Sequence, residues 1–216
     1  MQYHWLNKQN NKNLIVFFAG WSFDYIPFEF LDCKNNDVIV VFDYNSLDYD
    51  LPELDGYEHK TLITWSMGVY VGYLLKDKLP KFDKKIAING TVFPVDDEFG
   101  IPLKTFYLTL KFAETGLQGK FYKNVFNNEE WYERYCKNPV QRSIESRVKE
   151  LSALDKFIKG SQINYDDTYY DRAIIGKTDK IIPTKNQISF WKDKGELVDC
   201  GHFPFYNYKS WDEICN

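Results

Sequence analysis

Histidine is scarce in this chain, which has only three among 216 residues: His4, His59 and His202. The four cysteines show no Cys-x-x-Cys spacing, and with so few histidines they form no convincing zinc-binding set. Neither a glycine-rich phosphate loop nor a dinucleotide-binding fingerprint is present. We therefore expect no metal and no organic cofactor, and we expect the cysteines to be reduced thiols.

Long apolar runs are missing as well, since no segment approaches the ~18 consecutive apolar residues of a membrane span. The first twelve residues are polar and contain no apolar signal core. The formal net charge is -4, and no strong basic stripe that would suit a nucleic acid is present. These features lead us to expect a cytoplasmic protein that binds neither a membrane nor a nucleic acid.

Apolar side chains are abundant, at 44% of the residues, and aromatic residues alone make up 18%. This supplies a sizeable core, and the length favours a single domain over residues 1–216. Apolar runs alternate with segments of helical spacing, which favours an α/β fold with a mainly parallel sheet and helices on both faces. The expected strands are 14–18, 38–42, 62–65, 85–88, 173–175 and 196–198, and the clearer helices are 69–76, 184–191 and 208–214.

The segment Thr64-Trp65-Ser66-Met67-Gly68 joins an expected strand to an expected helix. A serine in a tight turn between a strand and a helix is typical of a nucleophile elbow. The usual pattern begins with glycine, because strand and helix pack closely there, whereas this chain has Thr64. A bare Ser-x-Gly is common by chance, so the assignment of Ser66 as a nucleophile depends on the rest of a catalytic set.

An activated serine needs a base, and His202 is the only histidine after Ser66. The order serine, carboxylate, histidine is that of α/β hydrolases. Asp179 follows the expected strand at 173–175, so it should reach the same edge of the sheet as His202. Asp199 is closer to His202 in sequence and is its main rival. We predict a triad of Ser66, Asp179 and His202.

The expected strand at 14–18 ends in Ala19-Gly20-Trp21-Ser22. Hydrolases of this kind take one oxyanion donor from the loop after an early strand and one from the residue after the nucleophile. The backbone N–H groups of Trp21 and Met67 are therefore the predicted oxyanion hole. Ordinary core packing of the Trp21 side chain is compatible with this role of its backbone.

Residues from about 91 to 160 break the alternation of strands and helices. This stretch is rich in phenylalanine and tyrosine and lies where α/β hydrolases insert a helical lid. Most of its aromatic residues should form the core of the lid itself. A few should roof Ser66 and line an apolar channel for an acyl chain.

Several motifs resemble those of the BioG-type pimeloyl-[acyl-carrier-protein] methyl ester esterases. They are Phe18-Ala19-Gly20-Trp21, Phe42-Asp43-Tyr44, Trp65-Ser66-Met67-Gly68-Val69, Ile88-Asn89-Gly90-Thr91 and Asp96-Asp97-Glu98-Phe99-Gly100-Ile101-Pro102. The resemblance runs from about residue 14 to His202 and is weakest between about 105 and 165. It implies an α/β hydrolase that removes the methyl ester from pimeloyl-carrier protein late in pimeloyl synthesis for biotin.

The implied partner is an acyl carrier protein, which is acidic and presents a phosphopantetheine phosphate. Basic residues outnumber acidic ones between residues 101 and 160, so a basic lid surface containing Arg142 and Arg147 would steer such a carrier. A solvated helix face explains the same charges without a partner. We expect a monomer. A broader carboxylesterase or acyl thioesterase, and a non-enzymatic binding protein of the same fold, remain as alternative functions.

Overall fold

The expected apolar runs form one sheet in the computed structural model, which describes residues 1–48 and 50–216. Its strands are β1 (Gln2–Asn7), β2 (Asn13–Phe18), β3 (Asn36–Phe42), β4 (His59–Trp65), β5 (Lys84–Ile88), β6 (Arg172–Gly176) and β7 (Gly195–Val198). Among the described residues, the seven strands are ordered β1-β3-β2-β4-β5-β6-β7. All neighbours pair in parallel except β1, which is antiparallel to β3. The predicted mainly parallel sheet is confirmed.

The edge strand β1 was not expected from the sequence. None of its six residues is fully buried, because the strand has a neighbour on one side only. Polar side chains such as Gln2 and Asn7 therefore interrupt the apolar pattern by which the central strands were recognised. In contrast, every residue of β3 is buried, as expected for a strand inside a parallel sheet.

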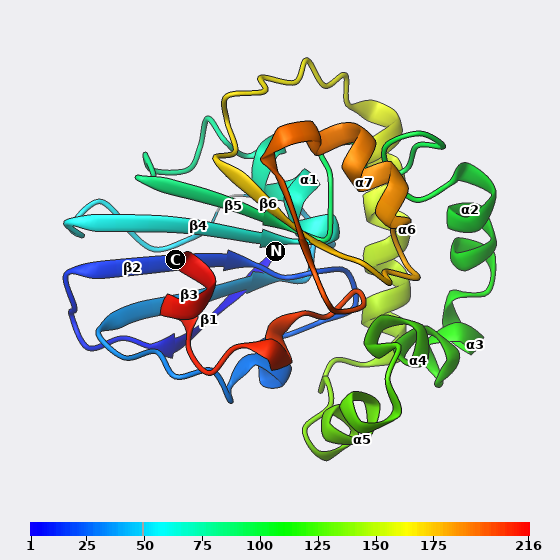
Figure 1. The fold of residues 1–216 in the computed structure, drawn as a ribbon, viewed down its shortest axis with the longest axis horizontal. Coiled ribbons are helices and arrows are strands. Elements are labelled where there is room, and N and C mark those ends of the chain that lie inside the picture. The colour runs from blue at the N-terminus through cyan, green and yellow to red at the C-terminus, as the bar shows by residue number, and fades with distance from the viewer. Residues whose placement is uncertain (49) are drawn as a thin grey trace.

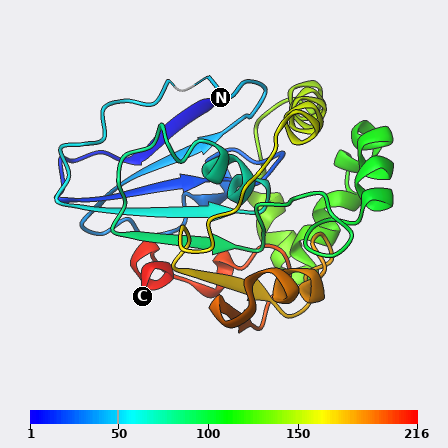
Figure 2. The ribbon, with the colours of Figure 1, turned by 90° about the horizontal axis from the view of Figure 1, so that it is seen from above.

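Helices and short helical turns cover both faces of the sheet (Figures 1 and 2). On one face, α1 (Met67–Leu74) and α7 (Thr184–Trp191) pack against β5 and β6 in a shared apolar cluster. On the other face, Phe17 contacts Phe28, Phe205 and Trp211. These residues come from the 3-10 turns η1 (Ile26–Phe28) and η3 (Phe205–Asn207) and from α8 (Trp211–Cys215). The expected helix at 208–214 therefore begins only at Trp211, and a further 3-10 turn, η2 (Lys192–Lys194), precedes β7.

Five helices lie between β5 and β6 in sequence. They are α2 (Leu103–Lys111), α3 (Ala113–Leu117), α4 (Lys120–Phe126), α5 (Glu129–Lys137) and α6 (Ile144–Gly160). Figures 1 and 2 show them gathered at the end of the sheet toward which the parallel strands run, with α6 nearer the sheet than α2. The loops after β2, β3, β4, β5 and β6 open toward these helices, so the candidate site lies between the sheet and α2–α6.

Candidate active site

Ser66 occupies the sharp turn between β4 and α1. Its backbone angles are φ 57° and ψ -124°, a strained conformation for a residue other than glycine. Two glycines allow the chain to pass closely around this turn. A Cβ at Gly68 would lie 2.3 Å from the Phe18 oxygen, and one at Gly90 would lie 2.4 Å from the Ser66 oxygen. The local geometry is therefore that of a nucleophile elbow, held by close backbone contacts.

Thr64, the departure from the usual elbow pattern, is accommodated by a glycine on the helix side. A Cβ at Gly72 of α1 would lie only 2.8 Å from the Thr64 Cγ2 atom, so the missing side chain of Gly72 provides the space that Thr64 fills. The Thr64 hydroxyl also donates to the Tyr170 hydroxyl at 3.1 Å, and Tyr170 donates to the Val69 carbonyl at 3.0 Å. Strand and helix thus approach closely although the first residue of the motif is threonine.

Ser66, His202 and Asp179 form one chain of hydrogen bonds. His202 Nε2 lies 2.8 Å from Ser66 Oγ, and His202 Nδ1 lies 2.8 Å from Asp179 Oδ2. The side chains of His202 and Asp179 are 3% and 0% exposed. The rival carboxylate, Asp199, is exposed on the surface. Such an arrangement lets the imidazole take a proton from the hydroxyl while the carboxylate fixes the imidazole tautomer.

The Asp179 carboxylate is itself held in place by four donors. Oδ1 accepts the backbone N–H groups of Ile181 and Ile182 at 2.8 and 3.0 Å. Oδ2, the oxygen that meets His202, also accepts Gln187 Nε2 at 2.9 Å. Gln187 comes from α7 and is fully buried. Its position eight residues after Asp179 on a following helix was not singled out in the sequence, where buried and exposed glutamines look alike.

Asn89 connects the loop that carries His202 to the start of the loop that carries Asp179. It was not identified as a site residue from the sequence. Its Nδ2 donates to the carbonyls of Gly201 and His202 at 3.0 and 2.9 Å, and its Oδ1 accepts the Gly176 N–H at 2.6 Å. Trp65 Nε1 adds a second bond to the His202 carbonyl at 2.8 Å. Asn89 belongs to one of the recognised motifs, so a signal was present, but its partners are more than eighty residues away in sequence.

The predicted oxyanion donors belong to two stretches of backbone that adjoin the serine. A Cβ at Gly20 would lie 3.0 Å from Ser66 Cβ, so the loop carrying Trp21 runs directly against the nucleophile. Met67 is the first residue of α1, where backbone N–H groups have no acceptor inside the helix. Within the described residues, neither the Trp21 N–H nor the Met67 N–H donates a hydrogen bond. Both are thus available to an oxyanion.

Cys200 is the thiol closest in sequence to His202. Burial, followed by the negative charge of Asp179, raises the pKa of the Cys200 thiol to about 12. A thiol that stays protonated at neutral pH is a poor nucleophile. Ser66 is therefore the better candidate for attack on a substrate.

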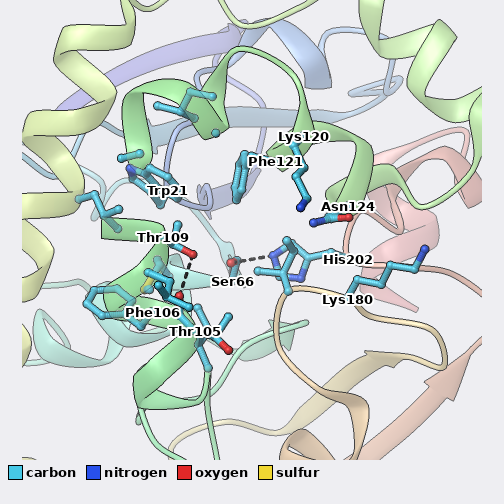
Figure 3. Close-up of a pocket in the computed structure, with 18 of the residues that line it drawn as sticks. Trp21, Ser66, Thr105, Phe106, Thr109, Lys120, Phe121, Asn124, Lys180 and His202 are labelled. Atoms are coloured by element: carbon cyan, nitrogen blue, oxygen red, sulfur yellow. Dashed lines mark hydrogen bonds between the residues drawn. The ribbon is translucent and has the colours of Figure 1, made fainter. Parts of the chain in front are cut away.

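A cavity of about 320 Å³ opens onto Ser66 and His202. Most of its wall is apolar and comes from the loop after β2 and from the inserted helices: Trp21, Phe23, Trp65, Ile101, Phe106, Leu108, Phe112, Leu117, Phe121, Leu151 and Ile181. Figure 3 shows Lys120, Asn124 and Lys180 on the His202 side of the cavity, with Phe106, Thr105 and Thr109 on the opposite side. The cavity thus combines an apolar interior with a cationic rim.

Arg142 and Arg147 do not form the exposed basic surface that was expected. The Arg142 side chain is 8% exposed, with Asp43 at 2.9 Å and Glu150 at 2.7 Å. Arg147 is also buried, and its guanidinium donates to the Tyr122 hydroxyl. The prediction that these two arginines meet a carrier protein is therefore corrected, because internal acceptors already occupy both guanidinium groups.

Within residues 1–48 and 50–216, no group of three or more His, Cys, Asp or Glu side chains has the arrangement needed to hold a metal ion. No helix in residues 1–48 and 50–216 has both the length and the apolar character needed to cross a membrane.

Known proteins resemble this chain in sequence and in fold. Residues 1–214 match the family model described as pimeloyl-ACP methyl esterase BioG. The structure superposes on that of BioG from Haemophilus influenzae with a TM-score of 0.91 at 28% identity, covering 100% of both chains. An esterase from Exiguobacterium antarcticum has the same fold, with a TM-score of 0.61 at 17% identity over 98% of this chain and 90% of that one.

One relative has a name that describes a different reaction, the transfer of a methyl group. The chain is 34% identical over 203 residues to a malonyl-[acyl-carrier protein] O-methyltransferase of Bacteroides fragilis. The match covers 94% of this chain but 40% of that protein, so this chain spans less than half of the relative's length. The family match over nearly the whole chain and the superposition on the Haemophilus protein lead to one conclusion: this chain belongs to the BioG family of α/β hydrolases.

Proposed function

We propose that this protein is a serine carboxylesterase that removes the methyl group of pimeloyl-[acyl-carrier protein] methyl ester during biotin biosynthesis. The observation that carries the proposal is the hydrogen-bonded chain of Ser66, His202 and Asp179 beside an apolar cavity, in a member of the BioG family. A serine with its base and carboxylate suits ester cleavage, and an apolar cavity suits a chain of methylenes.

In the proposed reaction, Ser66 Oγ attacks the ester carbonyl carbon while His202 accepts the hydroxyl proton. Asp179 holds the imidazole in the required tautomer and stabilises the imidazolium. The backbone N–H groups of Trp21 and Met67 stabilise the oxyanion, and loss of one such donor typically costs about 3–4 kcal/mol of transition-state stabilisation. His202 then gives its proton to the departing methanol. Water, activated by the same histidine, releases the acid and regenerates Ser66.

The name of the Bacteroides relative supports a carrier-bound methyl ester as the substrate. That name describes the formation of a methyl ester on an acyl group carried by acyl carrier protein. An esterase that removes such a methyl group performs the complementary step. An apolar cavity of about 320 Å³ with Ser66 on its wall has the character needed to hold the methylenes of the acyl chain.

We further propose that α2–α6 act as a lid over Ser66 and that the carrier approaches the cavity rim. Lys120 and Lys180 line the cavity and are exposed, and within the described residues neither forms an ion pair. Helix α2, on the opposite side of the cavity, exposes Leu103, Tyr107 and Leu108. A cavity with lysines on one side and exposed apolar side chains on the other suits an acidic carrier with a phosphate-bearing arm. These lysines replace Arg142 and Arg147 in the proposal.

Product analysis tests the esterase proposal. The protein is incubated with pimeloyl-carrier-protein methyl ester, and the carrier is examined by mass spectrometry, with Ser66→Ala as the control. The expected products are methanol and a pimeloyl thioester still attached to the carrier. Free carrier thiol as the main product would indicate a thioesterase instead. Cleavage of short p-nitrophenyl esters alone would fit a broader carboxylesterase, and no hydrolysis of any ester would indicate a non-enzymatic binding protein.

Charge reversal at the rim tests the carrier surface separately. Lys120→Glu and Lys180→Glu should lower kcat/KM for the carrier-bound ester about tenfold or more and leave a small soluble ester almost unaffected. The effect should shrink at high salt, because exposed charges are screened beyond ~8 Å at physiological ionic strength. Lys156→Glu, an exposed change on α6 that does not line the cavity, is the matched control. Equal losses for rim and control variants would rule out this surface.

A further inference from the structure

Glu150 of α6 holds two loops at the carboxyl edge of the sheet. Its carboxylate is fully buried, although it belongs to one of the inserted helices. Oε2 accepts the backbone N–H of Ser22 at 3.1 Å, and Oε1 accepts that of Tyr44 at 2.9 Å. Ser22 follows β2 and Tyr44 follows β3. One side chain of the insertion therefore fixes the loop that carries Trp21 and its neighbouring loop.

Arg142 completes this arrangement, and its partners explain why it is buried. Nη1 donates to Glu150 Oε2 at 2.7 Å and to the Phe23 carbonyl at 3.3 Å, while Nη2 pairs with Asp43 at 2.9 Å. Burial raises the pKa of Glu150, and the Arg142 guanidinium and the two backbone donors oppose that rise. Because its three hydrogen-bond partners, the N–H groups of Ser22 and Tyr44 and the Arg142 guanidinium, are all donors, these contacts favour the ionised form.

The loop held by Glu150 is a tight turn with a strained residue. The Phe23 N–H donates to the Gly20 carbonyl at 3.3 Å, and Ser22 has φ 77°. A positive φ at the third position is the requirement of a type II turn, which normally places glycine there. Serine is held in this conformation by the Glu150 bond to its N–H and by the Tyr122 hydroxyl at its Oγ.

Trp21, the second residue of the same turn, is fixed by α6 as well. Its indole Nε1 donates to the Arg147 carbonyl at 2.8 Å. The indole and the following peptide group are thus both attached to α6, while the Trp21 N–H donates no hydrogen bond within the described residues. The direction of that N–H is set by a turn whose conformation depends on the inserted helix.

We infer that α6 positions the oxyanion hole: Glu150, paired with Arg142, holds the turn that aims the Trp21 N–H at the substrate oxygen. Glu150 is a positioning residue, because it touches neither substrate nor Ser66. The inference rests on the proposed serine esterase function. The inference also separates the inserted helices into a fixed part and a part that can move. Helix α6 belongs to the fixed part, because its movement would disrupt the oxyanion hole. Any opening of the cavity must come from α2 and α3, because Tyr122 of α4 contacts Ser22 and Arg147.

A purely structural role for Glu150 predicts a different result from a positioning role. If Glu150 only stabilises the fold, its replacement lowers the melting temperature, and the molecules that remain folded react normally. If it aims an oxyanion donor, replacement weakens the binding of the tetrahedral oxyanion much more than that of the ground-state ester.

The test compares Glu150→Gln with Tyr122→Phe, which removes the hydroxyl at Ser22 without changing a charge. Glu145→Gln, an exposed change on the same helix, is the matched control. Three quantities are measured: the melting temperature, kcat and KM for p-nitrophenyl butyrate, and the inhibition constant of a short alkyl trifluoromethyl ketone. Such a ketone forms a hemiketal with Ser66, and its oxyanion must occupy the hole.

Glu150→Gln should lower kcat and ketone affinity together by about 10–100-fold, while KM changes by less than about threefold. Tyr122→Phe should lower kcat and ketone affinity together by about 3–10-fold. If Glu150→Gln does not fold, the Tyr122→Phe result tests the positioning role by itself. Folded variants that bind the ketone as tightly as the wild-type protein would overturn the positioning role and leave the esterase proposal intact. A wild-type protein that neither hydrolyses the ester nor binds the ketone would instead overturn the esterase proposal and, with it, the inference.

Discussion

Replacement of Asn89 by aspartate provides a sharp test of how the site is held together. The side chain keeps its size, and the remaining oxygen still accepts the Gly176 N–H. The amide nitrogen, however, becomes an oxygen that faces the carbonyls of Gly201 and His202, which lie 3.0 and 2.9 Å from that nitrogen in the wild-type protein. Two attractive contacts thus become repulsive ones in a side chain that is 1% exposed.

The loss of folding stability expected for Asn89→Asp can be worked out from the hydrogen bonds that remain. The His202 carbonyl keeps its bond from Trp65 Nε1, so only the Gly201 carbonyl loses its side-chain donor entirely. A buried acceptor left unpaired costs about 1–3 kcal/mol, and a second lost hydrogen bond costs about 1 kcal/mol. We therefore expect a loss of about 2–4 kcal/mol, which for a chain of this length lowers the melting temperature by roughly 5–15 °C.

The loss of folding stability in Asn89→Asp should increase as pH rises. Burial and the two carbonyl oxygens raise the pKa of the introduced carboxyl in the folded state above its unfolded value of about 3.9. A protonated carboxyl can donate to one carbonyl, so the variant is least destabilised near pH 4. The destabilisation should grow as pH rises from about 4 and level off above the folded pKa. Thermal unfolding of Asn89→Asp and wild type at several pH values between 4 and 8 measures this difference.

Activity should fall as well, because Asn89 anchors the backbone of His202. A displacement of about 1 Å can cost about 100-fold in rate, so kcat on a small ester should fall about 10–100-fold at temperatures where the variant is folded. Asn207→Asp, which adds the same charge at an exposed position, is the control. A folded Asn89→Asp protein with wild-type melting temperature and kcat at pH 8 would refute the reasoning.

Three further sets of substitutions test the site and its surroundings. Asp179→Asn should cut ester turnover by several orders of magnitude in a folded protein, whereas Asp199→Asn should be nearly harmless; steady-state kinetics that reversed this order would identify Asp199 as the acid. Arg142→Glu should lose stability by about 3–5 kcal/mol, because the new charge faces Asp43 and Glu150 without compensation, and denaturant unfolding would contradict this if the variant unfolded like wild type. Gly72→Ala should lose about 1–3 kcal/mol through its contact with Thr64, and Thr64→Ala in the same chain should recover part of that loss in a double-mutant cycle.

The fold and the hydrogen-bonded core of the site follow from local sequence patterns. Buried parallel strands appear as short apolar runs, and the loops after them meet at one edge of the sheet. The order Ser66, Asp179, His202 therefore led to three residues that the structure brings within hydrogen-bonding distance. The strand β1 lacks such a run because it lies at the edge and none of its residues is fully buried.

The supporting residues could not be identified in the same way, because their roles depend on distant partners. Asn89 acts on backbone groups more than eighty residues away, and Gln187 acts on a carboxylate through a turn of α7. The effect of Thr64 on the elbow likewise depends on Gly72, a position that a search for the five-residue motif does not include. Such pairs become visible only when strand and helix are placed in space.

The sequence contains a pattern that indicates why Arg147 is buried and does not form an exposed docking surface. Arg147, Glu150, Leu151 and Leu154 are buried on α6, and their spacing of i, i+3, i+4 and i+7 marks one face of a helix. Two of these four positions carry opposite charges, which desolvation would make costly without partners. A charged residue within an apolar helical stripe therefore indicates an internal ion pair or a backbone anchor, whereas a docking surface requires charges on the opposite face. By this criterion Lys156 lies on the exposed face of α6, whereas Arg147 and Glu150 belong to its buried face.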